Sequence, residues 1–364
     1  MKSYKWREVL SIVNGKNQKY VENPNGTYPI YGSGGIIGYA TDFLCPENSI
    51  ILGRKGSINK PIFVKEKFWN VDTAFGIIPN KNILLPLFLY YFCIFFNFEK
   101  LNTTVTIPSL TKSNLFDITI NIPDLKIQTK ITNILSKIDI IIYQKTVQLS
   151  KLDTLVKSRF VEMFGDPVKN PLGWNTSPFL SMGYCKNGMN FHTGDSGIKM
   201  HCLGVGDFKD YSIIDGTDHL PTISLKETPP EESMLQDGDI LFVRSNGNKA
   251  LVGRSLVVYP HNTPTTYSGF CIRYRLTSFD VNITYLLCVL KTDSIRKKMI
   301  GRGANIQNIN QQTLATLDIP TPPIDLQEKF AAFVEQVDKS KLAVKQSLEK
   351  LETLKKSLMQ DYFG

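Results

Sequence analysis

The sequence predicts an α/β protein in which two mixed α/β domains, related by pseudo-twofold symmetry, are joined by two long helices in an antiparallel coiled coil. Three observations predict this fold: an internal repeat without gaps, a heptad pattern in both copies of the repeat, and short β-branched runs between turn residues in the flanking segments. With 364 residues, 42% of them hydrophobic and 21% charged, the chain is long enough for two domains that each bury a core.

The internal repeat organises the chain. Residues 107–165 align without a gap onto residues 306–364, at a constant offset of 199. Two unrelated amphipathic helices would share leucines, but not the proline, the glutamine and the terminal Phe-Gly that recur here, so we interpret the segments as copies of one unit. The matched residues are Leu115, Ile120, Pro123, Gln128, Asp139, Leu149, Leu152, Leu155 and Phe164-Gly165 in the first copy, and Leu314, Ile319, Pro322, Gln327, Asp338, Leu348, Leu351, Leu354 and Phe363-Gly364 in the second.

Each copy begins as a strand and continues as a long helix. Residues 118–123 alternate and stop at a proline, and residues 317–323 do the same. Seam residues then recur in alternating steps of four and three over four heptads, which predicts a coiled coil and therefore a helical partner. The predicted seam consists of Ile131, Leu135, Ile138, Ile142, Leu149, Leu152 and Val156 in the first helix and Phe330, Val334, Val337, Val344, Leu348, Leu351 and Leu358 in the second, with Lys145, Arg159, Lys341 and Lys355 also at seam positions.

The partner of each long helix is predicted to be the other one. The segment of about 160 residues between them can span the length of a helix, so both orientations are sterically possible. Antiparallel pairing relates the copies by a twofold axis and places one globular domain at each end. The seam lysines either set the register or extend their charged ends into water.

The domain organisation follows from the repeat. We assign residues 1–123 and 166–323 to the two globular domains, residues 124–165 to the central helix and residues 324–364 to the distal helix.

The two globular segments are also distant copies of each other. Residues 49–54 align with residues 239–244 at an offset of 190, and Phe75 aligns with Phe270 at an offset of 195. Offsets that grow steadily toward 199 are what loop insertions produce. Each segment also opens near a tryptophan, Trp6 in the first and Trp174 in the second.

No motif for catalysis, cofactor binding or metal binding was found. The sequence has neither a phosphate-binding G-x-x-x-x-G-K-[ST] loop nor an Asn-Pro-Pro-Tyr-like tetrad for amino-methyl transfer. Residues 31–38 are glycine-rich but precede no long helix pattern, so we interpret them as a turn-rich loop. The six cysteines lie far apart and the four histidines lack catalytic or zinc-binding spacing, so we expect reduced thiols, structural histidines, no cofactor and no metal.

Charge and hydropathy limit the partners. No apolar run has the length of a membrane span and the N-terminus has no apolar signal core, so we expect a cytoplasmic protein that does not bind membranes. The formal net charge of +9 weakly favours a polyanionic partner.

Three segments have the composition of loops that read double-stranded DNA. Arginine can bind guanine through two hydrogen bonds, Asn can bind adenine, and Lys and Ser bind phosphates. Such residues also occur in ordinary turns, but segments 53–60 and 244–249 stand at equivalent places in the two copies, and segment 302–308 leads into the second repeat. The predicted DNA-contacting residues are Arg54, Lys55, Ser57, Asn59 and Lys60, then Arg244, Ser245, Asn246, Asn248 and Lys249, and finally Arg302 and Asn305.

With these motifs in view, the chain resembles the specificity (S) subunits of type I restriction–modification systems over its whole length. The order and duplication of the motifs carry the resemblance more than any one of them. They are Ile-Pro-Ser-Leu at 107–110 with its counterpart at 306–309, the strand exit Ile-Pro-x-Pro-Pro-x-x-x-Gln at 319–327, the helix end Met-Phe-Gly-Asp-Pro at 163–167 and the tract at 28–39. The first copy has Asp124 where a second proline is usual, which leaves the start of that helix open.

The resemblance implies two target recognition domains that each read one half of a bipartite DNA sequence, held apart by the coiled coil. It also implies two methyltransferase (M) subunits, which bind S-adenosylmethionine and methylate adenine, and motor-nuclease (R) subunits, so that the chain itself is non-catalytic. Three alternatives stay open: a recognition subunit of a type II-like fused methylase–nuclease, a coiled-coil scaffold that binds only protein, and a nuclease in its own right, for which no clustered acidic metal site is found.

Overall fold

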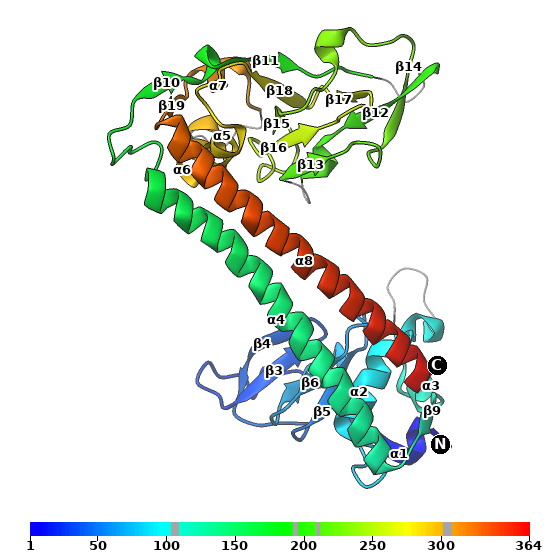
Figure 1. Ribbon diagram of the computed structural model, residues 1–364. Helices are drawn as coiled ribbons and strands as arrows, with labels where there is room; N and C mark the ends of the chain where they lie inside the picture. The colour runs from blue at the N-terminus through cyan, green and yellow to red at the C-terminus, as the bar shows by residue number, and fades with distance from the viewer. Residues whose placement is uncertain (103–108, 192–195, 209–211, 301–307) are drawn as a thin grey trace. The chain divides into compact units, whose positions relative to one another are not determined.

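The computed structural model describes residues 1–102, 109–191, 196–208, 212–300 and 308–364. The chain divides into two compact units, which we call the first unit (residues 1–148 and 344–364) and the second unit (residues 149–343). Each unit contains a globular part and a segment of each long helix, α4 (Leu125–Phe164) and α8 (Ile324–Phe363), as the ribbon shows (Figure 1). The predicted α/β fold with two long helices is confirmed.

The globular part of the first unit is built around an antiparallel sheet. Its elements are β1 (Lys2–Lys5), α1 (Trp6–Val9), β2 (Leu10–Asn14), β3 (Tyr28–Gly32), β4 (Gly35–Ala40), β5 (Ser49–Gly53), β6 (Ile62–Val64), β7 (Trp69–Asn70), β8 (Ala74–Pro79), α2 (Pro86–Phe95), the 3-10 helix η1 (Phe98–Leu101), α3 (Lys112–Phe116) and β9 (Thr119–Ile122). The main sheet has the order β2-β8-β5-β6, a second sheet has the order β4-β3-β7, and β1 pairs with β9. All five residues of the central strand β5 are buried, as its unbroken apolar run favours.

The globular part of the second unit has the same plan. Its elements are β10 (Thr176–Pro178), η2 (Phe179–Ser181), β11 (Gly183–Asn187), β12 (Ile198–Leu203), η3 (Val205–Phe208), β13 (Ile213–Asp215), β14 (Thr222–Leu225), η4 (Glu231–Ser233), β15 (Asp239–Val243), β16 (Ser255–Tyr259), β17 (Thr265–Tyr267), β18 (Cys271–Leu276), α5 (Ile283–Leu290), α6 (Asp293–Ile300), α7 (Gln311–Ala315) and β19 (Asp318–Pro320). The main sheet is β11-β18-β15-β16-β13, the second sheet is β14-β12-β17, and β10 pairs with β19.

Strand pairing shows that the two globular parts are copies of one fold. The order β2-β8-β5-β6 corresponds to β11-β18-β15-β16, with antiparallel pairing throughout both sets. In the second sheets, β3 and β12 each have one antiparallel and one parallel neighbour. The second unit adds β13, parallel to β16, at the sheet edge.

Hydrogen bonds correct two correspondences proposed from the sequence. In the β5–β8 ladder Leu52 is opposite Phe75, and in the β15–β18 ladder Phe242 is opposite Ile272, so the counterpart of Phe75 is Ile272 and not Phe270. The sequence alignment matched two phenylalanines, whereas the sheet register equates positions. Similarly, the backbone N–H of Trp6 donates to Ile118, and that of Phe179 donates to Leu317, at distances of 2.9 and 2.8 Å. Phe179, rather than Trp174, therefore occupies the place of Trp6.

The glycine-rich tract at 31–38 is not the expected loop. It forms most of a hairpin between β3 and β4, with Gly32 opposite Gly35 at the turn. Gly35 has φ +130°, which is accessible to glycine and rare for other residues, so this glycine allows the tight reversal.

A buried glutamine fixes the start of each long helix. The carboxamide of Gln128 accepts a hydrogen bond from the N–H of Leu85 (2.8 Å) and donates to the carbonyls of Ile83 (2.8 Å) and Pro123 (2.9 Å). Both Gln128 and Gln327 are fully buried. In the second unit, the Gln327 carboxamide accepts from Asn282 (2.9 Å) and donates to Asp280 (3.1 Å) and Pro322 (2.7 Å). The shared glutamine thus ties each helix to the segment that leads into α2 or α5.

The terminal phenylalanine of the repeat fixes the other end of each helix. In the second unit, the ring of Phe164 lies 4.7 Å from the ring of Tyr285 on α5 and 5.4 Å from that of Phe330. In the first unit, the ring of Phe363 lies 5.0 Å from that of Phe88 on α2. Each globular part therefore holds the beginning of one long helix and the end of the other, which explains why glutamine and phenylalanine recur together in the repeat.

Asp124 explains the departure of the first copy from the double proline. Its carboxylate accepts a hydrogen bond from the N–H of Ile127 at 2.8 Å, three residues into the chain that follows. This is the geometry of a helix N-cap, and α4 begins at Leu125. The helix start is therefore as well defined in the first copy as after Pro323 in the second.

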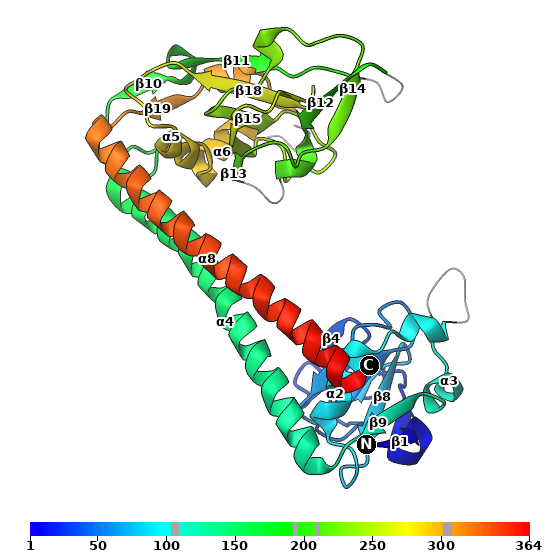
Figure 2. The ribbon, with the colours of Figure 1, turned by 45° about the vertical axis from the view of Figure 1, so that its right-hand side comes forward.

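Within each unit the helical segments lie side by side (Figures 1 and 2). All the predicted seam residues are buried or half-buried. In the first unit, Lys355 of α8 pairs with Asp139 of α4 at 2.5 Å, and in the second unit Lys341 of α8 pairs with Asp153 of α4 at 2.8 Å. Going from one pair to the other advances α4 by 14 residues and takes α8 back by 14, or two heptads, so both pairs share one antiparallel register.

Candidate nucleic-acid interface

A hydrogen-bonded frame holds the first predicted loop at the end of β5. The N–H of Arg54 donates to the carbonyl of Thr73 (2.8 Å), and the Arg54 carbonyl accepts from the N–H of Leu110 (2.9 Å). A bridge between Lys55 and Ser109 continues this pairing by one residue. Three chain segments, after β5, before β8 and before α3, are thereby fixed beside one another.

The second unit repeats this frame at the end of β15. The N–H of Arg244 donates to the carbonyl of Phe270 (2.8 Å), and the Arg244 carbonyl accepts from the N–H of Ile309 (2.8 Å). Ser245 bridges to Asn308 as Lys55 does to Ser109. The arginines therefore occupy equivalent backbone positions, whereas the other three frame positions carry Lys, Thr and Ser in the first unit and Ser, Phe and Asn in the second.

The first loop presents an arginine and two lysines to solvent. Arg54, Lys55 and Lys60 are exposed, and the Arg54 guanidinium lies 5.8 Å from the centre of the Phe75 ring. The loop folds back closely onto β5, because a Cβ at Gly53 would lie only 2.6 Å from the carbonyl oxygen of Ser57.

Two further predicted contacts of the first loop are placed differently. Ser57 is half-buried. The Asn59 carboxamide accepts from the N–H of Phe98 (2.8 Å) and donates to Asn97 (3.2 Å), so it supports the start of η1. Asn59 therefore already has a structural role.

The second loop is organised by its own asparagines. The carboxamide oxygen of Asn246 accepts from the N–H of Asn248 (2.8 Å), and that of Asn248 accepts from the N–H of Ala250 (3.0 Å). Arg244 and Ser245 are half-buried, and the Arg244 guanidinium donates to the carbonyl of Gly269 at 3.4 Å. Lys249 is exposed. Of the third predicted segment, Arg302 and Asn305 lie outside the described residues.

An aromatic residue that the sequence did not single out for DNA contact lies at the second frame. Phe270 is 61% exposed although its chain neighbour Cys271 is fully buried. Its ring helps to line a hollow of about 400 Å³, together with Val205, Ser245, Asn246, Gly247 and Asn308. Sequence gave no signal for this, because an exposed phenylalanine beside an apolar strand has the same pattern as a buried one.

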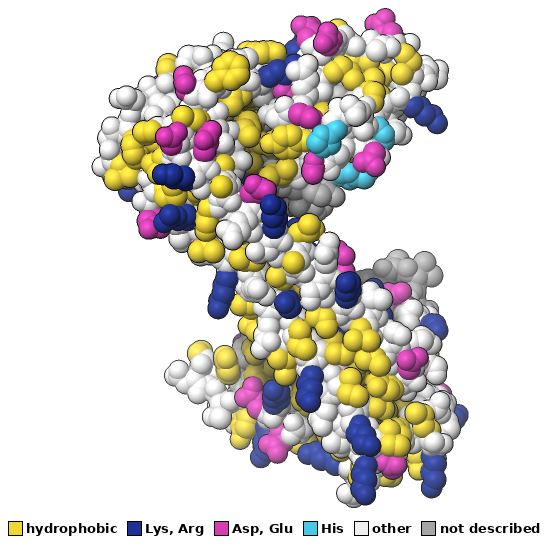
Figure 3. Space-filling model, in the orientation of Figure 1, with side chains coloured by type: hydrophobic (Ala, Val, Ile, Leu, Met, Phe, Trp, Pro, Cys, Tyr) yellow, Lys and Arg dark blue, Asp and Glu magenta, His cyan; other side chains and the backbone are white. Residues whose placement is uncertain are grey.

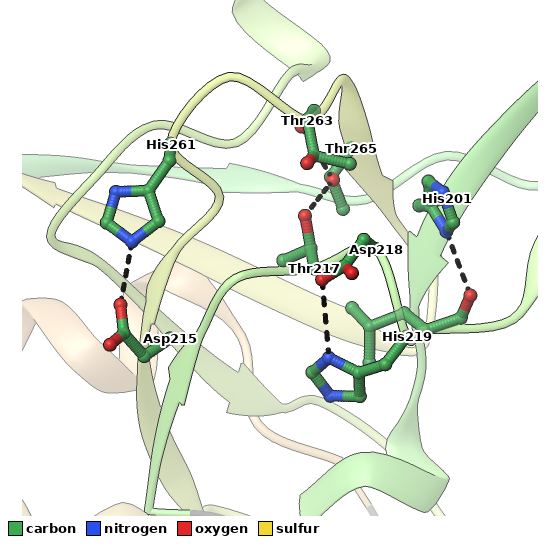
Figure 4. A network of polar contacts seen from close by, with 9 residues as sticks. His201, Asp215, Thr217, Asp218, His219, His261, Thr263 and Thr265 are labelled. Atoms are coloured by element: carbon green, nitrogen blue, oxygen red, sulfur yellow. Dashed lines mark hydrogen bonds and ion pairs between the residues drawn. The ribbon is translucent and has the colours of Figure 1, made fainter.

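The described histidines are held separately by different partners, as Figure 4 shows. His261 contacts Asp215 through Nε2 (2.7 Å) and Asp237 through Nδ1 (3.3 Å), while Nδ1 of His201 is 2.9 Å from the carbonyl oxygen of Leu220. The hydrogen bond to Asp215, followed by the charge of Asp237, raises the pKa of His261 above its usual value of 6.5. This favours an imidazolium that joins β13 to the loops around β15 and β16.

Other polar groups of the site's surroundings have structural partners. All six cysteines are free, and burial raises the pKa of Cys45 and Cys202 to about 12. Among the residues with a described position, no group of three or more His, Cys, Asp or Glu is arranged to hold a metal ion. Nor does any helix in the described part of the chain combine the length and the apolar character needed to cross a membrane.

Comparison with known proteins gives one consistent family. The chain matches the family model for the type I restriction modification DNA specificity domain over residues 1–151 and 223–354, well over half of its length. It is 28% identical over 204 residues to the StySPI type I restriction enzyme specificity subunit of Salmonella potsdam, a match that covers 53% of this chain and only 43% of that relative.

Two further relatives cover nearly the whole chain. A putative type I restriction enzyme specificity subunit of Haemophilus influenzae, S.HindORF215P, is 23% identical over 345 residues, which is 91% of this chain and 86% of that protein. The solved structure of the type I restriction–modification S subunit from M. genitalium is 16% identical, with a TM-score of 0.62, over 100% of this chain and 96% of its own. The structural likeness shows the fold.

Proposed function

The chain belongs to the type I restriction–modification DNA specificity family, and on that premise we propose that it reads a bipartite DNA sequence for a restriction–modification complex. The two globular domains, residues 1–123 and 166–323, would each read one half-site. One observation carries the proposal: the same hydrogen-bonded frame occurs in both units, with arginine at one shared position and different side chains at the other three. A duplicated reader with different contact residues suits two different half-sites.

The residues of the frame suit the chemistry of DNA. Arg54 and Arg244 would bind guanine or a phosphate, while Lys55 and Lys249 would bind phosphates. Arg302 and Asn305 remain proposed contacts on the basis of their sequence alone. The half-buried Arg244 would exchange its bond with the Gly269 carbonyl for one to DNA, so we expect it to contribute less affinity than the exposed Arg54.

The chain would depend on partner subunits for chemistry. We propose that it binds two M subunits, which carry S-adenosylmethionine and methylate adenine, and R subunits that cleave unmethylated DNA, and that it needs no cofactor of its own. Hydrophobic side chains are exposed over the first half of α4 on the face in Figure 3. In the first unit Ile127, Ile134 and Ile141, spaced by seven residues on this helix, are 43%, 41% and 39% exposed. Such a stripe suits packing against a helix of a partner. A protein with this role works where the DNA is, which we take to be the cytoplasm.

Methylation mapping tests the proposal. The full chain is produced with the M subunits of its own system, and methylated adenines are located across a DNA of known sequence. We expect a two-part motif with an unread spacer, and we expect Arg54→Ala to relax only one half and Arg244→Ala only the other. Arg159→Ala, an exposed arginine on α4 paired with Glu162, is the matched control and should change neither half.

Three outcomes would contradict the proposal. They are a single continuous motif, loss of both halves in each arginine variant, or methylation by the M subunits alone at the same sites. A protein-binding scaffold would give no preference at all, and a type II-like recognition subunit would copurify with a single fused methylase–nuclease instead of separate M and R subunits.

A further inference from the structure

We propose that Phe270 and Asn308, assisted by Asn246, form a pocket that reads one A·T base pair in the half-site of the second unit. The inference deepens the proposed function and rests on it, because it names the base pair that this surface would select. It assigns a specificity role to Phe270 and to Asn308, which line the same hollow as Asn246.

The first observation is that Phe270 is rigid in its backbone but exposed in its ring. Its carbonyl oxygen accepts from the N–H groups of Arg244 (2.8 Å) and Ser245 (3.4 Å), and its own N–H donates to the hydroxyl of Ser268 (3.3 Å). The ring is nevertheless 61% exposed, beside the fully buried core residues Val243 and Cys271. A large aromatic group held out from a fixed strand end suits contact with a ligand, since it adds little to the core.

The second observation is the polar chemistry that faces this ring across the hollow. The backbone of Asn308 is held in place by the bridge to Ser245, and its carboxamide makes no hydrogen bond with any described residue. Asn246 uses its carboxamide oxygen to accept from Asn248, which leaves its NH₂ group available as a donor among the described residues. The hollow thus offers one donor–acceptor pair, one further donor and one aromatic surface.

These groups match the major-groove edge of an A·T pair. Adenine presents the N7 acceptor and the N6 amino donor, which a single carboxamide can bind through two hydrogen bonds, and thymine presents its C5 methyl group, for which an aromatic ring is a suitable contact. A G·C pair has no methyl group and presents the N7 and O6 acceptors side by side, which a carboxamide cannot match with its oxygen. The volume of about 400 Å³ admits the edge of one base pair with the side chains that read it.

The first unit lacks this combination. Thr73 occupies the backbone position of Phe270, and Ser109 that of Asn308. The same frame there offers hydroxyl groups, which bind several bases without strong preference. The A·T preference is therefore expected in one half-site only.

A selection from duplexes of random sequence tests the inference, with the full chain in complex with its M subunits. The motif selected by the wild type is first divided into halves by the effects of Arg54→Ala and Arg244→Ala. Each thymine in the half that depends on Arg244 is then replaced, one at a time, by deoxyuridine, which lacks only the C5 methyl group. Affinities are measured for the wild type, Phe270→Ala, Asn308→Ala and the control Phe279→Ala, another phenylalanine of the second unit that is 98% exposed.

We expect one thymine whose replacement weakens binding of the wild type about fourfold, the equivalent of one buried methyl group at ~0.8 kcal/mol. Phe270→Ala should bind the thymine and deoxyuridine duplexes equally, whereas Phe279→Ala should behave as the wild type. Asn308→Ala should lose preference for adenine in that same base pair by about 5- to 150-fold, the range for a two-hydrogen-bond contact. Retained selection of the other half-site by each variant shows that it is folded.

The inference is overturned if Phe270→Ala keeps the full sensitivity to deoxyuridine, if the wild type shows none, or if Phe279→Ala gives the same loss. In each of these cases the wild type still selects a bipartite motif, so the proposed function stands. If the wild-type complex selects no motif, the proposed function fails and this inference fails with it. Phe270→Thr, which introduces the residue of the first unit, is a second variant expected to abolish the methyl discrimination.

Discussion

Lengthening both long helices by one heptad should move the two half-sites apart without changing the bases that are read. Seven residues are inserted after Leu149 in α4 and seven after Leu348 in α8. Both points lie between the two ion pairs, Asp139 with Lys355 and Asp153 with Lys341, in both helices. Each pair therefore stays intact in its own unit, and the heptad spacing of the seam is preserved.

The size of the shift follows from helix geometry. Seven residues at a rise of about 1.5 Å add ~10.5 Å of helix, which equals about three base pairs of B-DNA at ~3.4 Å each. The same three base pairs rotate the groove by nearly a third of a turn, since one turn takes ~10.5 base pairs. We therefore expect a preferred spacer about three base pairs longer, with lower overall affinity where the rotation strains the complex.

Inserting into only one helix should be worse tolerated. The ion pairs are 14 residues apart on each helix, so a helix with seven additional residues can keep only one pair in register with an unchanged partner. The apolar seam then also loses its match over the remaining segment.

The assay is the mapping of methylated adenines, with the M subunits present, for the wild type, the two single insertions and the double insertion. A replacement of seven existing residues by the inserted sequence, without change in length, controls for composition. An active double insertion whose spacer equals that of the wild type would refute the role of the helices as a ruler. Altered bases in either half would refute the separation of reading from spacing.

Three further predictions test other parts of the structure. Gln327→Leu should lower the free energy of unfolding by about 2–5 kcal/mol in chemical denaturation, because three buried backbone groups lose their hydrogen bonds, while Gln144→Leu, at an exposed position on α4, should change it little. His261→Gln should lower Tm at pH 5 to 6 but hardly above about pH 8, since a pKa raised in the folded state stabilises below the unfolded pKa of 6.5 and the contribution disappears as pH rises through the folded pKa. Arg54→Ala should weaken cognate binding by ~1–3 kcal/mol and relax one base position, whereas Lys55→Ala should weaken all sequences alike and reduce the slope of log K against log salt by about one; equal effects of both on every sequence would contradict this division.

The long helices were predictable from sequence because their information is local. A heptad seam and its partner copy are visible in the order of residues alone, and the family resemblance that follows from them is confirmed by the family match. The reason for the shared glutamine was not visible. Gln128 and Gln327 bond to backbone groups about 45 residues earlier in the chain, and no pattern in the sequence marks such a pairing.

The details of the candidate site were less predictable, because they depend on strand register. Equivalent places for Arg54 and Arg244 follow from an alignment of two apolar strands. The partners of those arginines, Thr73 and Phe270, lie on a strand that joins the site only after the sheet has formed. The alignment therefore matched Phe75 to Phe270 by residue type, and missed that Phe270 stands at the end of its strand with its ring in solvent.

The two copies differ at positions that touch solvent and agree at positions that hold the fold. Glutamine at the start of each long helix and phenylalanine at its end are identical in both, and each is fixed by contacts within one unit. The frame positions beside the arginines are supported by backbone hydrogen bonds, so their side chains are not needed for the frame itself. Substitution there changes what is presented without moving the helix anchors. A protein built in this way can acquire a new half-site by a few side-chain changes while the geometry that sets the spacer stays as it is.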